Sequence, residues 1–336
     1  MVRSGAPQRR ARSLRRAAEL SITVRRAAAN STQLSMIRVR PAPGADGENR
    51  VPSMPVKVPA QLQPLKGTIK DALLAAAFAK ADGFIVSYIK SGRTWFRFIL
   101  ANYFNEIFGL GVQVDFHSIF AIIPNYLLNT KQGWGAYRFA DRPQVPFLVV
   151  SHLPYRPLLF GARNILFVLR DPRDVMVSAY FHKTRHAGLF NGDIDTFLRN
   201  PEHGILDYIR YFNSWAGPLG RHRHLVVAYE RLSTDTTRVL EEVLAFLDLR
   251  VDREALAEAL SASSFRAMRS IEVQSGHPVH KYDRADIESL HVRRGKIGGF
   301  RDYLDDAQIA YLDQVCASQL NASAKHLLAR AGIALG

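Results

Sequence analysis

The segment Lys90-Ser91-Gly92-Arg93-Thr94-Trp95 places cations, hydroxyl groups and a glycine in one short stretch of the chain. It follows the apolar run 84–88 and precedes residues 94–107, which have helical character. At such a junction of strand, loop and helix, backbone N–H groups and the positive end of the helix dipole bind anions. The lysine precedes the only glycine, so the segment lacks the Gly-x-x-x-x-Gly-Lys-Ser/Thr spacing of nucleoside triphosphatases. These residues predict an anion site without identifying the anion.

A second candidate anion site follows the apolar run 164–169, where Arg170 precedes an Asp-Pro pair. Proline suits the first turn of a helix, because its missing N–H costs nothing there. A guanidinium at a strand end can donate two charge-assisted hydrogen bonds to a phosphate, and Ser178 on the following helix can add a neutral donor. The alternative is that Arg170 pairs with Asp174 in a surface turn.

Together these two segments resemble the donor-binding loops of the cytosolic-type sulfotransferases, which use 3′-phosphoadenosine-5′-phosphosulfate (PAPS). The resemblance implies that the first loop binds the 5′-phosphosulfate through Lys90, Ser91, Gly92, Arg93 and Thr94, and that Trp95 stacks on adenine. The second segment, residues 168–178, matches the family's strand-turn-helix that binds the 3′-phosphate. Arg170 and Ser178 match its two phosphate ligands.

A third segment, residues 293–300, resembles the family's late Arg-Lys-Gly-x-x-Gly-Asp-Trp stretch, which closes over the nucleotide. Arg293, Arg294 and Gly295 match its ligands. Gly299 and Phe300 stand where the family has aspartate and tryptophan, so we expect the rest of this loop to be placed differently. Tyr229, Ser263 and Phe265 lie where the family contacts adenine, although each alone is equally consistent with core packing or a helix cap.

The candidate catalytic base is His152, because Ser151-His152-Leu153-Pro154 resembles the family's Thr-His-Leu-Pro element. A neutral imidazole accepts a proton at neutral pH, since its ordinary pKa is about 6.5. The resemblance implies in-line transfer without a metal, in which Lys90 stabilises charge on the leaving phosphate. The family commonly has a lysine two residues before this histidine, where this chain has Val150. We hypothesise that Arg93 supplies the missing charge.

His182 and His186 are four residues apart on a predicted helix, which is a spacing that zinc ligands use. No third ligand is evident in the sequence. We therefore expect a solvated helix face here and no metal site.

The elements that position these residues are apolar runs that alternate with helical segments. The runs are 84–88, 146–151, 164–169 and 225–229, and the helices are expected at 94–107, at 172–180 and from Ser233 or Thr234 to Leu247. Continuous apolar strands alternating with helices predict an α/β domain whose central parallel sheet is covered on both faces. After Asp252 the chain is expected to be mainly helical, with a loop-rich insert over 271–300.

The composition limits the class of protein without selecting a ligand. The chain has 336 residues, is 47% hydrophobic and carries a formal charge of +15. That charge attracts anions, but nucleic acid, a membrane surface and a small polyanion would all satisfy it. Part of the arginine excess lies in the first forty residues. The apolar stretch 71–89 contains Lys80 and Asp82, so we predict no membrane span.

We expect a basic, mostly disordered extension over residues 1–60 and one sulfotransferase domain over residues 61–336. The extension resembles an Arg-rich organelle transit peptide, and a nucleic-acid-binding arm is a second interpretation. We favour a third, in which Met36 or Met54 is the true start. Cys316 is the only cysteine, which favours a reducing compartment. The expected location is the cytoplasm, or an organelle if the extension is a transit peptide.

The expected function is sulfuryl transfer to a hydroxyl or amine of a small-molecule or glycan acceptor, with adenosine-3′,5′-bisphosphate (PAP) as product. No nucleic-acid partner is expected, and a homodimer is left open. The aromatic content of four segments suggests a partly apolar acceptor; they are residues 116–126, 134–139, 181–190 and 271–282. One alternative is a small-molecule kinase that uses ATP and Mg²⁺. The other is a nucleic-acid-binding protein, which would leave the three motifs unexplained.

Overall fold

The computed structural model describes residues 66–127, 130–278 and 282–335. Every described residue belongs to one compact unit, Pro55–Gly336. The basic extension expected over residues 1–60 therefore lies outside the described residues. None of the described helices is long and apolar enough to cross a membrane.

Within the described residues, four parallel strands form one sheet in the order β2-β1-β3-β4. The strands are β1 (Gly83–Ser87), β2 (Leu148–Ser151), β3 (Asn164–Leu169) and β4 (His224–Ala228). In the central strand β1, Ile85 pairs with Val150 on one side and with Leu166 on the other. The predicted parallel sheet of apolar strands is confirmed, but β4 is buried only at Val227 and Ala228.

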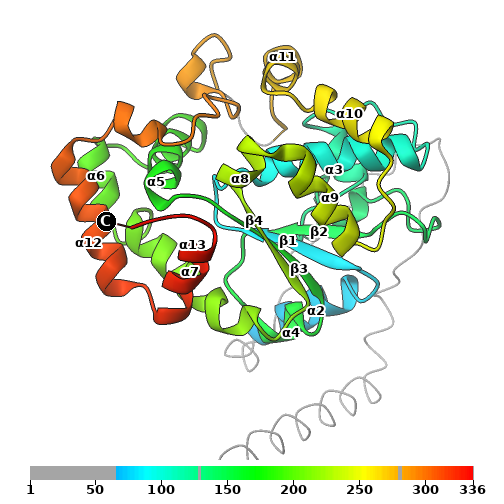
Figure 1. The fold of residues 1–336 in the computed structure, drawn as a ribbon, viewed down its shortest axis with the longest axis horizontal. Helices are drawn as coiled ribbons and strands as arrows, with labels where there is room; N and C mark the ends of the chain where they lie inside the picture. Colours follow the sequence, from blue (N-terminus) through cyan, green and yellow to red (C-terminus); the bar gives the residue numbers. More distant parts are fainter. Residues whose placement is uncertain (1–65, 128–129, 279–281, 336) are drawn as a thin grey trace, which may run out of the picture. The chain divides into compact units, whose positions relative to one another are not determined.

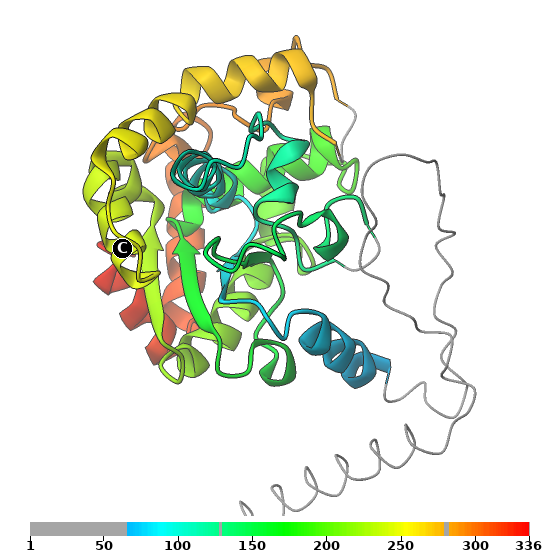
Figure 2. The ribbon, with the colours of Figure 1, turned by 90° about the vertical axis from the view of Figure 1, so that its right-hand side faces the viewer.

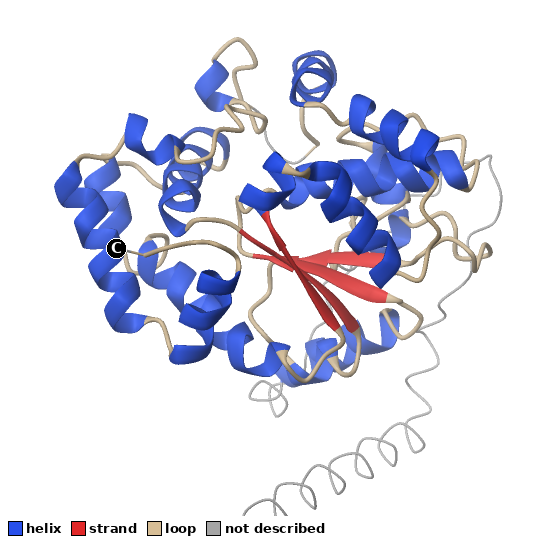
Figure 3. Cartoon of the chain, viewed as in Figure 1, coloured by secondary structure: helices blue, strands red, loops and turns tan. Residues whose placement is uncertain are grey.

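Alternate side chains of β1 enter two separate apolar cores, because successive residues of a strand point to opposite faces. Phe84 and Val86 belong to the core that includes Trp215 of α7 (Ile205–Leu219), and Phe84 packs edge-on against Phe160 at 5.1 Å between ring centroids. Ile85 belongs to the other core, with residues of α3 (Arg93–Ile107) and α9 (Thr236–Phe246). Figure 3 shows the sheet between these helices, and Figure 1 shows α7 and α3 on opposite sides of it.

The other α-helices cover the rest of these two layers. They are α2 (Lys66–Ala77), α4 (Pro157–Phe160), α5 (Pro172–Phe181), α6 (Ile194–Arg199), α8 (Tyr229–Thr234), α10 (Arg253–Ala262), α11 (Phe265–Ser275), α12 (Asp306–Gln319) and α13 (Ala322–Arg330). The prediction that the chain is mainly helical after Asp252 is confirmed for the described residues. Short turns of other helix types include a π-helix, His182–His186, directly after α5.

Two predicted boundaries are wrong. Ser233 and Thr234 do not cap a helix but end α8, and α9 begins after Asp235, whose φ of −140° interrupts the helical backbone. The loop-rich insert begins later than residue 271, because α11 continues to Ser275. The N-cap of α11 is Ser264, whose side chain accepts a hydrogen bond from the Ala267 N–H.

The carboxyl ends of the four strands lie at one edge of the sheet, because all strands run in the same direction. The segments that follow β1, β2, β3 and β4 begin with the Lys90 loop, His152, Arg170 and Tyr229, respectively. Figure 2 shows α10 and α11, in yellow, passing above the sheet. The topology therefore gathers the candidate residues of four separate segments.

Candidate active site

The loop after β1 turns sharply, and two of its residues have left-handed backbone conformations. Lys90 has a φ of 64° and Gly92 a φ of 89°. For a lysine this conformation is strained, and such strain persists where the surrounding structure holds it. Gly92 is also required by space, because an added Cβ would lie 2.3 Å from Cδ2 of Tyr229. The turn leads directly into α3, whose first N–H groups have no partner within the helix.

Buried polar groups of this loop face a positive environment. Ser91 is fully buried, and its Oγ has no hydrogen-bond partner among the described residues. The Lys90 ammonium donates to Nδ1 of His291 at 3.4 Å. Burial lowers the pKa of Lys90 to about 8; Glu272 opposes this shift, and the nearby charges of Arg293 and Arg170 contribute to it. A polyanion bound in the cavity that Lys90 lines would satisfy its ammonium group.

Arg170 follows β3 and lies over the ring of Tyr229, with 4.2 Å between its guanidinium carbon and the ring centroid. Its Nη2 donates to the Lys296 carbonyl at 3.0 Å and lies 3.4 Å from the Asp174 carboxylate. Its Nε has no hydrogen-bond partner among the described residues. The pairing with Asp174 that we considered as an alternative therefore exists, yet Arg170 also lines the cavity, as does Ser178.

An aromatic wall lines the same cavity as these two segments. The rings of Trp95 and Tyr229 pack edge-on at 5.8 Å, and Phe265 lines the same cavity. Trp95 donates its indole N–H to the Ser263 carbonyl at 3.0 Å. The Ser263 hydroxyl accepts a hydrogen bond from Asn102 and does not line the cavity. Ser263 thus positions Trp95 through its backbone carbonyl and does not itself face the cavity.

The late loop closes the cavity from a third side. Arg293 and Arg294 both line the cavity, and both donate to the Glu288 carboxylate, at 2.8 Å and 3.0 Å. Gly295 has a φ of 66°, and an added Cβ would meet the Phe265 ring at 3.0 Å. The turn at this glycine lets the loop approach the aromatic wall closely.

Asp174 holds the segment that contains Gly299 and Phe300, the two residues that differ from the family's aspartate and tryptophan. One carboxylate oxygen of Asp174 accepts the Gly298 N–H and the other accepts the Phe300 N–H, each at 2.9 Å. Phe300 itself is buried, at 1% exposure. The start of α5 therefore anchors the late loop, and the same carboxylate contacts Arg170.

His152 follows β2 and lines the cavity. Its Nδ1 lies 2.8 Å from the Ser87 carbonyl oxygen, which can only accept, so Nδ1 carries the proton and donates. Nε2 then carries the lone pair that a general base needs. Burial and the charge of Arg93 hold the pKa of His152 well below its ordinary value, so the ring is neutral at neutral pH.

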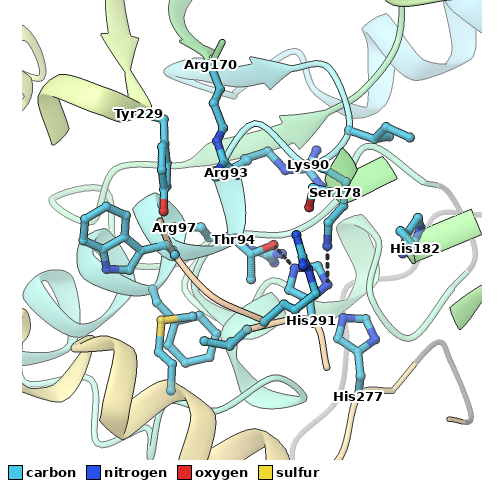
Figure 4. Close-up of a pocket in the computed structure, with 18 of the residues that line it drawn as sticks. Lys90, Arg93, Thr94, Arg97, Arg170, Ser178, His182, Tyr229, His277 and His291 are labelled. Atoms are coloured by element: carbon cyan, nitrogen blue, oxygen red, sulfur yellow. Dashed lines mark hydrogen bonds between the residues drawn. The ribbon is translucent and has the colours of Figure 1, made fainter. Parts of the chain in front are cut away.

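These residues surround one cavity of about 660 Å³. Figure 4 shows Lys90, Arg170, Ser178 and Tyr229 around it. Of the fifteen residues that the sequence assigned to the site, all but Ser91 and Ser263 line the cavity. Such an enclosed space with apolar walls and convergent polar groups is typical of a ligand site.

Comparison with known proteins identifies the family. The model of the sulfotransferase domain matches residues 80–324, which is most of the chain. The chain belongs to the sulfotransferase family.

Individual relatives are distant. Human sulfotransferase 2B1 is 27% identical over 254 residues, which are 71% of this chain and 66% of the human protein, just under two thirds of its length. The 3-alpha-hydroxysteroid sulfotransferase of Cavia porcellus is 25% identical over 249 residues, covering 70% of this chain and 82% of that protein. The structure of mouse sulfotransferase SULT7A1 complexed with PAP is 20% identical, with a TM-score of 0.54 over 77% of this chain and 93% of the mouse chain. The fold is thus that of the sulfotransferases.

This sulfotransferase lacks a lysine at position 150, where the fully buried Val150 lies in the core beside β1. Arg93 lies at the start of α3 and lines the cavity with Lys90 and His152. Burial lowers the pKa of Arg93 to about 10. The hypothesis that Arg93 replaces the family lysine stays a prediction.

The solvated helix face expected for His182 and His186 is wrong. His186 is only 7% exposed, and its ring stacks on Tyr282 at 4.4 Å. The two Nδ1 atoms lie 3.4 Å apart within the π-helix. Among the described residues, no three or more His, Cys, Asp or Glu side chains are arranged to hold a metal ion. The prediction failed because Tyr282, which stacks on His186, is distant from it in the sequence.

Sequence reasoning also missed Glu272 and His291. The fully buried Glu272 accepts the N–H groups of His291 and Val292, at 2.6 Å and 2.8 Å, and the Tyr282 hydroxyl. His291 in turn bonds Lys90 and, through Nε2, Oγ1 of Thr94 at 3.0 Å. Helix α11 therefore positions the segment that meets the donor loop. A glutamate inside a predicted loop carried no local signal of this role.

Proposed function

We propose that this sulfotransferase transfers the sulfuryl group of PAPS to a hydroxyl group of a small-molecule or glycan acceptor, with PAP as the second product. The observation that carries the proposal is that Lys90 and Arg170 line one cavity. They follow the neighbouring parallel strands β1 and β3, and the aromatic wall of Trp95 and Tyr229 lies in the same cavity. A nucleotide with anionic groups at two positions suits this arrangement.

The buried donors fit such a ligand. Arg170 lines the cavity, its Nε lacks a partner among the described residues, and phosphate oxygens accept hydrogen bonds from guanidinium groups. In this proposal the loop from Lys90 to Thr94 holds the 5′-phosphosulfate, and Arg170 and Ser178 hold the 3′-phosphate. Adenine lies against the aromatic wall and Phe265. Arg293, Arg294 and Gly295 close over the nucleotide, and Ser263 acts through Trp95.

The chain's own residues supply the proton transfer and the charge stabilisation. His152 is oriented by the Ser87 carbonyl, so its Nε2 can accept the proton of the acceptor hydroxyl. The acceptor oxygen then bonds to sulfur while the bond from sulfur to the 5′-phosphate oxygen breaks. The Lys90 ammonium stabilises the charge that develops on that phosphate. PAPS supplies the sulfuryl group already joined to a stable leaving group.

Two comparisons support the donor and the acceptor group. The mouse structure contains PAP, and the Cavia porcellus relative is named for a hydroxysteroid. A hydroxyl acceptor is therefore favoured over an amine. The division into an extension and a domain over residues 61–336, the cytoplasmic location and a homodimer stay predictions.

Thermal shift tests the donor assignment against the kinase alternative. A ligand that binds only the folded state increases the free energy of unfolding, and this increase grows with the logarithm of the ratio of ligand concentration to Kd. The melting temperature rises as a result. We expect PAP without metal to stabilise the protein and ATP with Mg²⁺ to have a much smaller effect. Stabilisation by ATP and Mg²⁺ alone would overturn the proposal.

A further inference from the structure

Arg93 and Arg97 are two cations on the cavity wall, and the donor-binding motifs account for Arg93 but not for Arg97 beside it. They are four residues apart on α3, so their side chains share one face of the helix. Both line the cavity, and the charge of Arg93 lowers the pKa of Arg97 and of His152. Like charges at this spacing repel each other, so the pair has a cost that the fold tolerates.

No carboxylate of the described residues pairs with either guanidinium. Arg97 is 5% exposed, donates to the Ile123 carbonyl and lies over the Phe120 ring at 4.3 Å. Its buried Nε has no hydrogen-bond partner in the described part of the chain. A buried cation with an unused donor is costly unless a ligand satisfies it.

The position of Arg97 separates it from the donor-binding groups. Its contacts are to residues 120 and 123, which belong to the segment before β2 and not to any of the three donor motifs. The donor motifs already contribute Lys90, Arg170 and the two arginines of the late loop to the cavity. Arg97 is therefore an additional cation in the cavity, beyond those that the donor motifs provide for the nucleotide.

The surroundings indicate the rest of the ligand. The same cavity has an apolar part formed by Phe98, Phe116, Ile119, Phe120 and Leu127, with Asn125 and Gln132 as neutral polar groups, and Phe120 lies under Arg97. Figure 4 shows Arg93 and Arg97 with Lys90 and Thr94 around the cavity. A ligand here would have an apolar body, a hydroxyl at His152 and an acidic group at the arginines.

We propose that Arg93 and Arg97 form a carboxylate-binding subsite, so that the acceptor is a hydroxylated carboxylic acid with an apolar or aromatic body. In this inference the Arg93 guanidinium binds the acceptor and does not replace the family lysine, while the backbone of Arg93 stays part of the loop that holds the 5′-phosphosulfate. The inference rests on the proposed function, since it names the acceptor class of that reaction. A guanidinium matches a carboxylate with two parallel hydrogen bonds, which neither a ketone nor an ester can accept with the same strength. Arg97 Nε and the Arg93 guanidinium are the donors that this subsite offers.

Calorimetry on the PAP-saturated protein tests this subsite without requiring turnover. The probes are 4-hydroxybenzoate, 3-(4-hydroxyphenyl)propionate and 12-hydroxydodecanoate, each compared with its primary amide. We expect at least one acid to bind about tenfold or more tightly than its amide, because only the acid offers a charged acceptor. Arg93→Met and Arg97→Met should each reduce that ratio, while Arg97→Met leaves PAP affinity unchanged.

Two further variants keep the result interpretable. Arg97→Lys retains the charge but not the fork, so it should keep part of the preference even if Arg97→Met does not fold. Arg238→Met removes an arginine whose side chain is 71% exposed on α9, and it should keep the full preference. Failure to bind PAP contradicts the proposed function and this inference with it. PAP binding without any preference for an acid, or with a preference that survives Arg97→Met, overturns the inference alone.

Discussion

Asp174→Asn should release the late loop and weaken donor binding, although Asp174 itself is not expected to touch the nucleotide. The carboxylate is 3% exposed and accepts the N–H groups of Gly298 and Phe300 through separate oxygens. It also lies 3.4 Å from Arg170. An asparagine keeps only one acceptor oxygen and turns an NH₂ group toward the other N–H.

The magnitude follows from the bonds that are lost. One charge-assisted hydrogen bond contributes about 1.5–3 kcal/mol, and a buried N–H left without an acceptor costs about 1–3 kcal/mol. We therefore expect the closed loop to lose about 3 kcal/mol, which corresponds to ~100-fold in an equilibrium constant. Because the nucleotide binds the closed loop, the apparent PAP affinity should fall by up to that factor.

Two measurements on the variant check this expectation. Calorimetry gives the PAP affinity, and hydrogen exchange reports the protection of the Gly298 and Phe300 amides. The matched control is Asp302→Asn, which removes a carboxylate of the same loop that is 33% exposed and pairs with Arg294 and Lys296. Exposed pairs contribute only about 0–1 kcal/mol, so this variant should resemble the wild type. If the two variants bind PAP equally well and show equal protection, the reasoning is refuted.

Three other predictions concern the donor loop and the base. Since the pKa of His152 is held well below its ordinary value, the base stays neutral as the pH falls to 6, and kcat/KM should decline only at lower pH. A decline centred near the ordinary histidine pKa of about 6.5 would contradict this. Because burial lowers the pKa of Lys90 to about 8, PAP affinity should weaken as the pH rises through 8, and Lys90→Arg should remove that dependence. A pH-independent affinity of the wild type between pH 7 and 9 would show that Lys90 does not act as the cation. Gly92→Ala should lower the melting temperature and the PAP affinity, since its Cβ would overlap the Tyr229 ring and its φ of 89° is unfavourable for alanine, at a cost of about 1–3 kcal/mol. A variant with wild-type stability would disprove the close packing of this loop.

Local patterns were sufficient to predict the sheet and the turns that follow β1 and β3. The strands β1 and β3 are short apolar runs, and the turns after them contain residues that suit helix starts, such as Pro172 and Gly92. These features depend on neighbours in the sequence. They could therefore be identified before the chain was folded.

Contacts between distant segments could not be predicted in the same way. Asp174 has the position of an acidic residue in a first helical turn, yet the two N–H groups that donate to it lie more than 120 residues later. His182 and His186 have the spacing of an exposed helix face, but residue 282 covers one of them. Ser263 lies next to the site as the resemblance implied, while its hydroxyl points to Asn102. In each case the tertiary contact decided the role of the side chain.

The most direct measurement of the proposed reaction is transfer of ³⁵S from labelled PAPS to a panel of hydroxylated acceptors. The wild type should produce a labelled product together with PAP, without added metal. His152→Ala should produce none while still binding PAP, and Lys90→Ala should also lose transfer. Normal transfer by His152→Ala would contradict the assignment of the base. Cleavage of ATP in place of PAPS by the wild type, with no labelled product from any acceptor, would contradict the proposed function itself.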